Sequence, residues 1–581
     1  MDFASVFCKK PVLNKKIEAD IFRTLRYVRS DKLKQILQNL LDEALTEIMK
    51  SEGIESDIPE YTIETPNNPD HGDFATNIAM KSAKIFRKKP MDIAAKITET
   101  VKHPLIKSAE AVMPGFINFR ISDTFYQDIV KKAVESDEFF TSDYGRGRKT
   151  MVEFVSANPT GPLHVGHGRN AAYGDSLARI MRAAGYDVHT EYYINDAGNQ
   201  MNNLGKSIYV RYLELLGRDV EFPEDGYKGE YIIDISKALL EENGGKIAEM
   251  PEAEAVAMCL ARGLTDITNE IALTLKNFNV DMEIWFSEKS LYKSGEVESS
   301  LKYLMDRGFI YEKDGALWFD STKFGDDKDR VVKRSNGEYT YFTSDIAYHK
   351  NKYDRGFMSV IDVWGADHHG YVKRLSSAIE AIGYEDRDFN VSLIQMVSLL
   401  SSGERVSMST RAGSFITLDW LVEEVGADAA RFFYAMRDYE AQFDFDIDLA
   451  KKKSSDNPVY YVQYAHARVQ SLLSKAENEG IKFELCTHLD KISSKEELEL
   501  IKKIYDYNSV LEQASRGRQP HRMAYYLQEL AALFHAYYFN NTIINAEDSE
   551  LTSVRLSIAV AVGNAVRNGL GLLGVSAPDR M

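Results

Sequence analysis

The chain has 581 residues, with 71 Lys and Arg against 88 Asp and Glu, and a formal net charge of −17. This length predicts several domains, because a domain typically holds roughly 100–200 residues. Hydrophobic residues make up 44% and aromatic residues 11% of the chain, which excludes a largely disordered or collagen-like protein. The acidic balance argues against indiscriminate coating of nucleic acid, but it is compatible with a local basic groove.

The three cysteines, Cys8, Cys259 and Cys486, show no C-x-x-C spacing. They predict a reducing compartment, so we expect a cytoplasmic protein with neither a disulfide framework nor a zinc site. Apolar runs stay well below the roughly 18 residues that a membrane span needs, and we therefore expect no membrane contact.

Residues 1–32 carry scattered Lys and Arg without clear periodicity, which predicts an N-terminal extension. Residues 33–125 alternate between helix and strand patterns, with YTIETP and GFINFRI as strands and a helix from Asn77. This alternation predicts a small α/β domain. A basic segment within it either faces RNA phosphates or forms a solvated helix face. Its members are Lys81, Lys84, Arg87, Lys88 and Lys89.

The clearest pattern spans residues 149–196. An apolar, β-branched strand leads into the turn Asn-Pro-Thr-Gly-Pro, helical spacing follows up to Gly185, and VHTEYYI resumes as a strand. This β-α-β unit predicts a Rossmann-like, doubly wound parallel sheet within residues 140–455. A second strand-rich half follows at 359–370 and 391–400, after a mostly helical insertion at about 206–334.

Residues 456–581 contain four long helical patterns and few glycines, which predicts an all-α helical bundle. Tyr460, Tyr461 and Tyr464 lie close to Arg468 in the first of these patterns. Aromatic rings can stack on splayed-out bases while arginines hold phosphates. Packing in the helical core is the alternative for at least half of these tyrosines.

The string His164-Val165-Gly166-His167 follows a strand and a turn and opens a helix, where backbone N–H groups and the helix dipole favour an anion. Both imidazoles can donate to phosphate oxygens, and Gly166 lets a flat base or ribose approach the backbone. A G-x-G-x-x-G fingerprint does not follow this strand, which counts against a dinucleotide cofactor.

In this context the chain resembles the class I aminoacyl-tRNA synthetases, whose HIGH motif binds ATP at this position, and more closely the arginyl-tRNA synthetases. The matching stretches cover nearly the whole chain after the extension: HGDFATNIA, SANPTGPLHVGHGRNAAYGD, EYYINDAGNQ, WFSEKSLY, VWGADHHGYVKRL, MSTRAGSFITL, AARFF, YVQYAHAR and LGVSAP. The resemblance implies that ATP activates L-arginine to arginyl adenylate, which is then transferred to the 3′ end of tRNA(Arg). It also implies that Mg²⁺ accompanies the ATP, that tRNA binds before arginine is activated, and that the helical domain reads the anticodon.

The resemblance further implies functional roles for particular residues. For ATP they are His164, Gly166, His167, Asp367, His368, Met408 and Ser409, and the catalytic residues are His164, His167 and Arg411. For arginine they are Glu153, Ser156, Asn158, Glu288, Tyr341 and Asp345. For tRNA we expect contacts from Lys84, Arg87, Lys88, Tyr460, Tyr464 and Arg468. Tyr341 and Asp345 are four residues apart, so they share a face if the segment is helical.

The second phosphate-handling motif of this class, KMSKS, reads Ser407-Met408-Ser409-Thr410-Arg411 in this chain. Both lysine ammonium groups are missing, and other cations must then neutralise the developing pyrophosphate charge. Arg411, Arg405, the histidine pair and Mg²⁺ are the candidates.

Two further groups of polar residues have alternative interpretations. Asp367, His368 and His369 are common metal ligands, but adjacent histidines on an extended segment point to opposite sides. We therefore expect ribose or adenine contacts from Asp367 and His368, and no metal site. Asn195, Asp196 and Gln200 either line the same cleft or cap the following helix.

Three alternatives to an arginine-specific enzyme stay open. A class I synthetase for another amino acid would still activate arginine after Asp345→Ala. A non-catalytic tRNA-binding paralogue would bind tRNA without aminoacylating it, which the altered SMSTR motif makes conceivable. A nucleotidyltransferase without tRNA would not need the two terminal domains. We expect the chain to act as a monomer.

Overall fold

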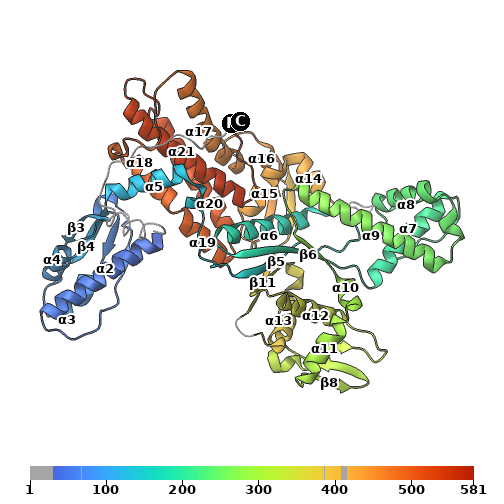
Figure 1. Ribbon diagram of the computed structural model, residues 1–581. Helices are drawn as coiled ribbons and strands as arrows, with labels where there is room; N and C mark the ends of the chain where they lie inside the picture. Colours follow the sequence, from blue (N-terminus) through green and yellow to red (C-terminus); the bar gives the residue numbers. More distant parts are fainter. Residues whose placement is uncertain (1–29, 67, 385–386, 407–414) are drawn as a thin grey trace. The chain divides into compact units, whose positions relative to one another are not determined.

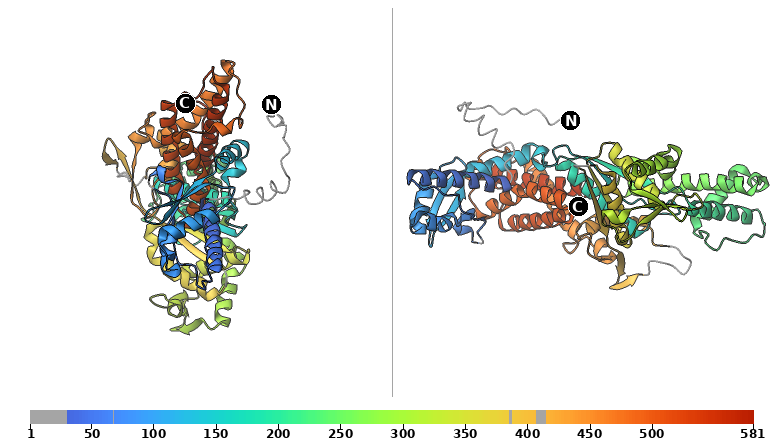
Figure 2. Two further views of the ribbon diagram at one scale, coloured as in Figure 1. Left: turned by 90° about the vertical axis from the view of Figure 1, so that its left-hand side faces the viewer. Right: turned by 90° about the horizontal axis from the view of Figure 1, so that it is seen from below.

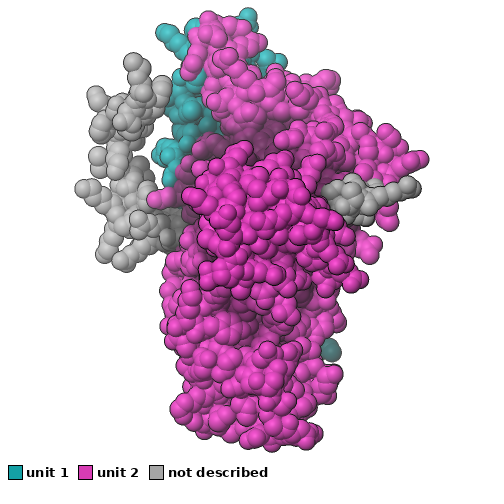
Figure 3. Space-filling model, turned by 90° about the vertical axis from the view of Figure 1, so that its right-hand side faces the viewer, with its two compact units in different colours: residues 1–136, 480–509, 541–561 teal, residues 137–479, 510–540, 562–581 magenta. Residues whose placement is uncertain are grey.

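The structure is a computed structural model that describes residues 30–66, 68–384, 387–406 and 415–581 (Figure 1). The chain divides into two compact units (Figure 3). Unit 1 comprises residues up to 136 together with 480–509 and 541–561, and unit 2 comprises 137–479, 510–540 and 562–581. In the part of the chain that the structure describes, no helix is long and apolar enough to cross a membrane.

Unit 1 contains a four-stranded antiparallel sheet in the order β1-β2-β4-β3. Its strands are β1 (Ile63–Glu64), β2 (Phe74–Thr76), β3 (Ile106–Val112) and β4 (Phe116–Ile121). Its helices are α2 (Ser30–Ser51), α3 (Ile78–Phe86), α4 (Pro90–Thr100), α5 (Asp123–Glu135) and α18 (Lys495–Tyr505). Helix α4 starts with proline at its first position, where the missing N–H costs nothing. The mixed architecture predicted for residues 33–125 is present.

Unit 2 is built on a five-stranded sheet in the order β12-β11-β5-β6-β7. All four strand pairs are parallel, which confirms the prediction of a parallel sheet. The strands are β5 (Lys149–Glu153), β6 (Asp187–Ile194), β7 (Ile284–Ser287), β11 (Ser359–Gly365) and β12 (Asp388–Ile394). Helix α6 (Val165–Ala183) lies on one face, and α12 (Tyr341–Asp354) and α13 (His369–Ile382) lie on the other (Figure 1).

The mostly helical insertion predicted at about 206–334 is not a single excursion from this sheet. Its residues Ile284–Ser287 form β7, which pairs with β6 at the sheet edge. Before β7, three helices pack against one another (Figure 2): α7 (Asn199–Leu215), α8 (Glu230–Asn243) and α9 (Glu252–Asn277). After β7 come α10 (Glu288–Lys293), α11 (Glu296–Asp306) and a small antiparallel sheet of β8 (Ile310–Lys313), β9 (Ala316–Phe319) and β10 (Arg330–Lys333).

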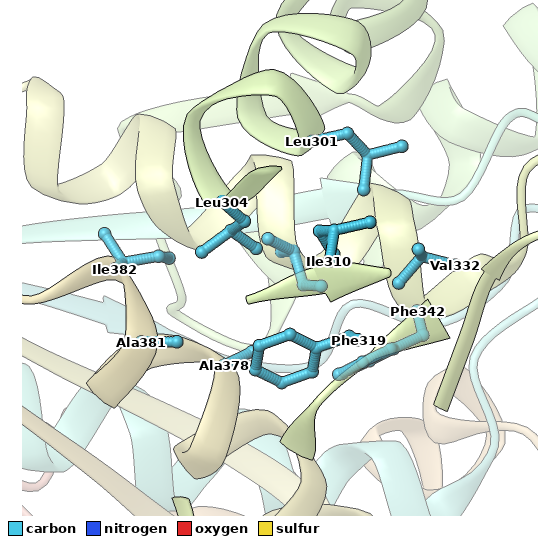
Figure 4. Packing of buried hydrophobic residues seen from close by; sticks show 10 residues of the cluster. Leu301, Leu304, Ile310, Phe319, Val332, Phe342, Ala378, Ala381 and Ile382 are labelled. Carbon is cyan, nitrogen blue, oxygen red and sulfur yellow. The ribbon is translucent and has the colours of Figure 1, made fainter. Parts of the chain in front are cut away.

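A buried apolar cluster joins this small sheet to α11, α12 and α13 (Figure 4). It includes Phe319 from β9, Val332 from β10 and Phe342 from the first turn of α12. Burial of such side chains stabilises the packing by roughly 1.5–3 kcal/mol each. The cluster thereby holds the N-terminal end of α12, which carries the candidate site.

The remainder of unit 2 contains a second small sheet and helices. The sheet has the order β14-β13-β15, with β13 (Val397–Ser401), β14 (Glu404–Val406) and β15 (Phe443–Asp446). The helices are α14 (Leu418–Val425), α15 (Ala427–Ala435), α16 (Ile447–Lys451), α17 (Pro458–Asn478), α19 (Tyr507–Gly517) and α20 (His521–Asn540). Helix α21 (Ser549–Leu572) contributes to both units. The sequence predicts four helices in the C-terminal region, but the structure has five. The segment ELELIKKIYDYNSVLEQA, predicted as one helix, is divided between α18 and α19.

Candidate active site

A cavity of about 320 Å³ lies at the carboxyl ends of β6 and β7, the edge at which parallel sheets usually bind ligands. Its lining residues are Tyr193, Asn195, Ala197, Gln200, Glu288, Tyr341, Ser344 and Asp345. Glu288 begins α10, and the last three lie in the first turns of α12. The structure therefore brings Glu288, Tyr341 and Asp345 together, as the arginine assignment requires. Sequence reasoning missed Tyr193, Ala197 and Ser344, which carry no signal of their own in a chain rich in tyrosine and serine.

Close contacts shape the cavity wall. The Tyr371 hydroxyl donates to the Asp345 carboxylate. Gly198 has a φ of 86°, and a Cβ added there would lie 2.9 Å from the Tyr341 hydroxyl. Glycine at 198 therefore allows both the left-handed backbone and the close approach of the Tyr341 ring.

Two carboxyl groups line this cavity, Glu288 at the start of α10 and Asp345 in α12. The pKa of Glu288 is raised to about 7, mainly by burial and also by the nearby Asp345 and Asp196, while hydrogen bonds from Ser344 and Tyr193 lower it in part. Burial also raises the pKa of Asp345. Both shifts reflect the cost of holding negative charge without a counter-ion. The cavity is therefore suited to a cation, and a planar guanidinium with five donors can bind two carboxylates at once.

The strand β5 and its following turn provide the other three residues assigned to arginine. The Ser156 hydroxyl donates to Glu153 Oε1 at 2.9 Å, and Ser156 Oγ accepts from the Tyr193 backbone N–H at 3.1 Å. Asn158 Oδ1 accepts from Asn195 Nδ2 at 3.2 Å. Ser156 and Asn158 thus contact residues that line the cavity. Glu153 does not line it, because its carboxylate is buried behind Ser156 and bonded to Lys352.

The turn after β5 has an unusual backbone. Val155 and Ser156 have φ values of 68° and 39°, a conformation that is costly for a β-branched residue. Asn170 of α6 stabilises it, because its Oδ1 accepts from the Val155 N–H at 2.7 Å and its Nδ2 donates to the Val363 carbonyl at 3.0 Å. Such strain persists where neighbouring structure enforces it, and it is common at functional sites.

The histidine pair forms the N-terminal cap of α6. His164 Nδ1 accepts from the N–H groups of Gly166 at 3.1 Å and His167 at 3.3 Å, and His167 Nδ1 accepts from the His164 N–H at 3.2 Å. The two rings stack with centroids 3.6 Å apart. A Cβ at Gly166 would lie 2.9 Å from the His164 ring, so this stacked arrangement requires glycine.

These contacts define the protonation state of both rings. A nitrogen that accepts a backbone hydrogen bond carries no proton, so each imidazole is the Nε2–H tautomer. Burial lowers the pKa of His164, and burial together with the neighbouring His164 lowers that of His167 to about 3. Among the described residues, neither Nε2 has a hydrogen-bond partner. The pair therefore presents two neutral N–H donors at a helix N-terminus, an arrangement suited to phosphate oxygens.

The other residues assigned to ATP lie at or beyond the end of β11. Asp367 and His368 form a short 3₁₀ turn there, and their side chains are exposed. Met408, Ser409 and Arg411, with the altered positions Ser407 and Thr410, lie outside the described residues. Across residues 30–66, 68–384, 387–406 and 415–581, no three His, Cys, Asp or Glu side chains gather as metal ligands.

Residues assigned to tRNA lie on both units. In unit 1, Lys84, Arg87 and Lys88 are exposed at the end of α3, although Lys88 Nζ pairs with Glu52 at 2.6 Å. In unit 2, the rings of Tyr460 and Tyr464 on α17 stack with centroids 6.2 Å apart. The Arg468 guanidinium lies 4.6 Å from the Tyr464 ring and 4.3 Å from the Tyr538 ring of α20.

Three family descriptions match successive parts of the chain. They are an arginyl tRNA synthetase N terminal domain at 33–121, a class I (R) tRNA synthetase catalytic domain at 129–439, and a DALR anticodon binding domain at 462–581.

Individual relatives match over nearly the full length. Arginine–tRNA ligase 1 of Halalkalibacterium halodurans is 46% identical over 556 residues, covering 95% of this chain and 100% of the relative. Arginine–tRNA ligase of Desulfosudis oleivorans is 48% identical over 557 residues, covering 94% and 100%. The structure of Thermus thermophilus arginyl-tRNA synthetase shares the fold, with a TM-score of 0.68 at 23% identity over 94% of this chain and 100% of that one.

Proposed function

This chain belongs to the class I arginyl-tRNA synthetases, and from that membership we propose that the cavity of Glu288 and Asp345 binds the arginine side chain while the His164–His167 turn binds ATP. The protein is an arginine–tRNA ligase of class I. The observation that carries the site assignment is the pair of carboxylates, Glu288 buried and Asp345 half-buried, which face one cavity at the carboxyl edge of the sheet.

The reaction has two steps. The arginine carboxylate attacks the α-phosphorus of ATP, a carboxylate–phosphorus bond forms, and pyrophosphate leaves with the electrons of the broken bond. A terminal ribose hydroxyl of tRNA(Arg) then attacks the activated carbonyl, losing its proton as AMP leaves. In this proposal the enzyme supplies positioning and charge stabilisation. The neutral Nε2–H groups of His164 and His167 donate to phosphate oxygens without changing their protonation.

The remaining assignments complete the proposal. Asn158 and Ser156 hold the arginine amino group, and Asp367 and His368 contact the nucleoside of ATP. Mg²⁺ enters with the ATP phosphates, and Arg411 adds positive charge there. Lys84, Arg87 and Lys88 contact tRNA(Arg) on one unit, and the stacked rings of Tyr460 and Tyr464 with Arg468 contact it on the other. The chain works as a monomer in the cytoplasm.

Aminoacylation assayed with each of the twenty amino acids and total tRNA tests the substrate assignment. Arginine alone is expected to be charged. The matches to arginine–tRNA ligases do not favour a synthetase for another amino acid or a non-catalytic paralogue. Pyrophosphate exchange in the same preparation tests the order of binding. We expect arginine-dependent exchange of pyrophosphate into ATP only when tRNA(Arg) is present. Equal exchange rates with and without tRNA would contradict this order of binding.

Arginine binding is expected to depend on pH through Glu288. The pKa of this carboxyl is about 7 in the free enzyme, and a bound guanidinium favours the ionised form. Binding therefore releases a proton, and the affinity for arginine falls as the pH drops below 7. We expect the arginine KM at pH 6 to be about tenfold higher than at pH 8.

Glu288→Gln provides the matched control, because it keeps the shape of the side chain and removes the titration. Its arginine KM should be raised at pH 8 and should change little between pH 8 and pH 6. The KM for ATP, measured in the same buffers, corrects for effects elsewhere. If the arginine KM of Glu288→Gln changes with pH as steeply as that of the unmodified enzyme, the titrating group is not Glu288.

A further inference from the structure

Three buried carboxylates lie in one row across the central sheet of unit 2. Asp362 of β11 pairs in register with Glu153 of β5, and Glu153 pairs in register with Glu191 of β6. All three are buried. Like charges directly opposite each other on neighbouring strands destabilise a sheet. The row therefore persists only because other groups compensate its charge.

Helix α12 supplies that compensation. Lys352 Nζ donates to Glu153 Oε2 at 2.5 Å and to Asp362 Oδ1 at 2.8 Å. Arg355, at the end of the helix, binds Glu191 through two nitrogens at 2.5 and 2.9 Å. The Tyr348 hydroxyl also donates to Glu191, at 2.6 Å.

His349 also contacts the row of carboxylates. Its Nε2 lies 2.8 Å from Asp362 Oδ2, and its Nδ1 lies 2.8 Å from the backbone carbonyl oxygen of Asp345. A carbonyl oxygen can only accept, so Nδ1 donates to Asp345, and Nε2 faces the Asp362 carboxylate. Burial by itself would raise the pKa of Asp362, but Lys352 and His349 hold it at about 2. Lys352, Arg355 and His349 thus face the carboxyl groups of the row, and burial raises the pKa of Glu153 against the lowering effect of Lys352.

Helix α12 carries both these contacts with the row and, nearer its N-terminus, the residues of the cavity. Tyr341, Ser344 and Asp345 line the cavity from its N-terminal end. The contacts of Lys352 and His349 join the two neighbouring strands β5 and β11 to this one helix, and His349 contacts the backbone of Asp345 itself. A guanidinium held by two hydrogen bonds is sensitive to displacements of less than 1 Å in its partner carboxylate.

We propose that Lys352 and His349 are positioning residues for arginine recognition, which dock α12 on the carboxylate row and thereby place Asp345 against the guanidinium. This inference rests on the proposed arginine cavity and adds residues that do not touch the substrate. Lys352 is wholly buried behind the cavity, and it acts through the orientation of the helix.

Lys352→Met tests the proposal by removing the ammonium while keeping much of the side-chain volume. We expect the arginine KM in aminoacylation to rise about ten- to a hundredfold, with the KM for ATP and for tRNA changed by less than about threefold. Thermal unfolding of the same variant will show a lower Tm, because Glu153 is left buried without its partner.

Arg431→Met is the matched control for a purely structural effect. Arg431 is also wholly buried, binds Asp175, and donates to the Leu573 carbonyl at 2.8 Å, but it contacts neither α12 nor the cavity. It should lower the Tm as much as Lys352→Met does. Its arginine KM should stay within about twofold of the unmodified enzyme, since global stability does not enter KM.

The double variant Lys352→Met/Glu153→Gln separates stability from positioning. It removes one charge of each sign and keeps an acceptor for Ser156, so the Tm should recover towards that of the unmodified enzyme. The arginine KM should remain raised, because α12 no longer has its link to β5. If Lys352→Met alone does not fold, the arginine KM of this double variant is used to test the positioning proposal.

A failure of the positioning proposal can be distinguished from a failure of the proposed arginine cavity. If Asp345→Asn leaves the arginine KM unchanged, the cavity assignment fails and the positioning proposal falls with it. If Asp345→Asn raises it while Lys352→Met does not, only the positioning proposal is overturned. An arginine KM that returns to normal together with the Tm in the double variant would overturn it as well.

Discussion

Asp345→Asn is expected to lower kcat/KM for arginine by roughly 10²- to 10³-fold, or about 3–4 kcal/mol, at the lower end of the about 3–5 kcal/mol that breaking a buried ion pair typically costs. Asp345 is half-buried at the cavity and accepts from the Tyr371 hydroxyl. The amide retains the size of the carboxylate but removes its charge. The guanidinium is then desolvated without a full counter-charge, and the loss should appear mainly as a raised arginine KM.

Steady-state aminoacylation at varied arginine, with saturating ATP and tRNA, measures this effect. Asp354→Asn is the matched control, because Asp354 lies at the other end of α12 and its half-exposed side chain pairs with Lys350 at 2.6 Å. A surface pair of this kind is worth about 0–1 kcal/mol, so kcat/KM should change by less than about threefold. A normal arginine KM in Asp345→Asn would exclude this carboxylate from substrate binding.

His167→Ala is expected to lower kcat by roughly 10²- to 10³-fold, the usual effect of removing one donor to charge that develops in a reaction. The arginine KM should change by less than about threefold, because the imidazole acts on the phosphates. Substitution also removes one of the reciprocal hydrogen bonds that cap α6, since His167 Nδ1 accepts from the His164 N–H. Loss of such a cap typically costs about 1 kcal/mol of stability.

Two isosteric variants separate these roles. An asparagine amide can occupy the position of Nδ1 and keep the cap, whereas a glutamine amide reaches the position of Nε2 and keeps the outward donor. We expect His167→Asn to retain thermal stability but lose turnover, and His167→Gln to retain more turnover at a lower Tm. Single-turnover adenylate formation and thermal unfolding measure the two effects. A defect confined to the arginine KM would contradict the assigned role.

The parts of the fold that were predictable are those with strong local periodicity. The strand–turn–helix unit around His164 and the helices of the C-terminal region fall close to their expected positions. The edge strands were less visible: β7 is four residues of half-buried IWFS, and it was assigned to an insertion. Its strand character comes from pairing with β6, and such long-range pairing leaves little trace in a short segment.

The candidate site shows the same division. Glu288, Tyr341 and Asp345 were expected together from family resemblance, and they line one cavity. Glu153 was expected beside them, but its carboxylate is bonded to Lys352 behind the cavity wall. Both positions are acidic residues next to a motif, so their local sequence cannot separate a residue that binds substrate from one that supports the site.

Local sequence therefore determined the strand–turn–helix unit around His164 and the alternation of strands and helices, and family resemblance indicated Glu288, Tyr341 and Asp345. Tertiary structure alone decided the Nε2–H tautomers of the histidine pair, the neighbours of each carboxylate, and the docking of α12 on the row of Asp362, Glu153 and Glu191. The reason is that hydrogen-bond partners and burial depend on residues distant in the chain, and these two quantities control charge and protonation.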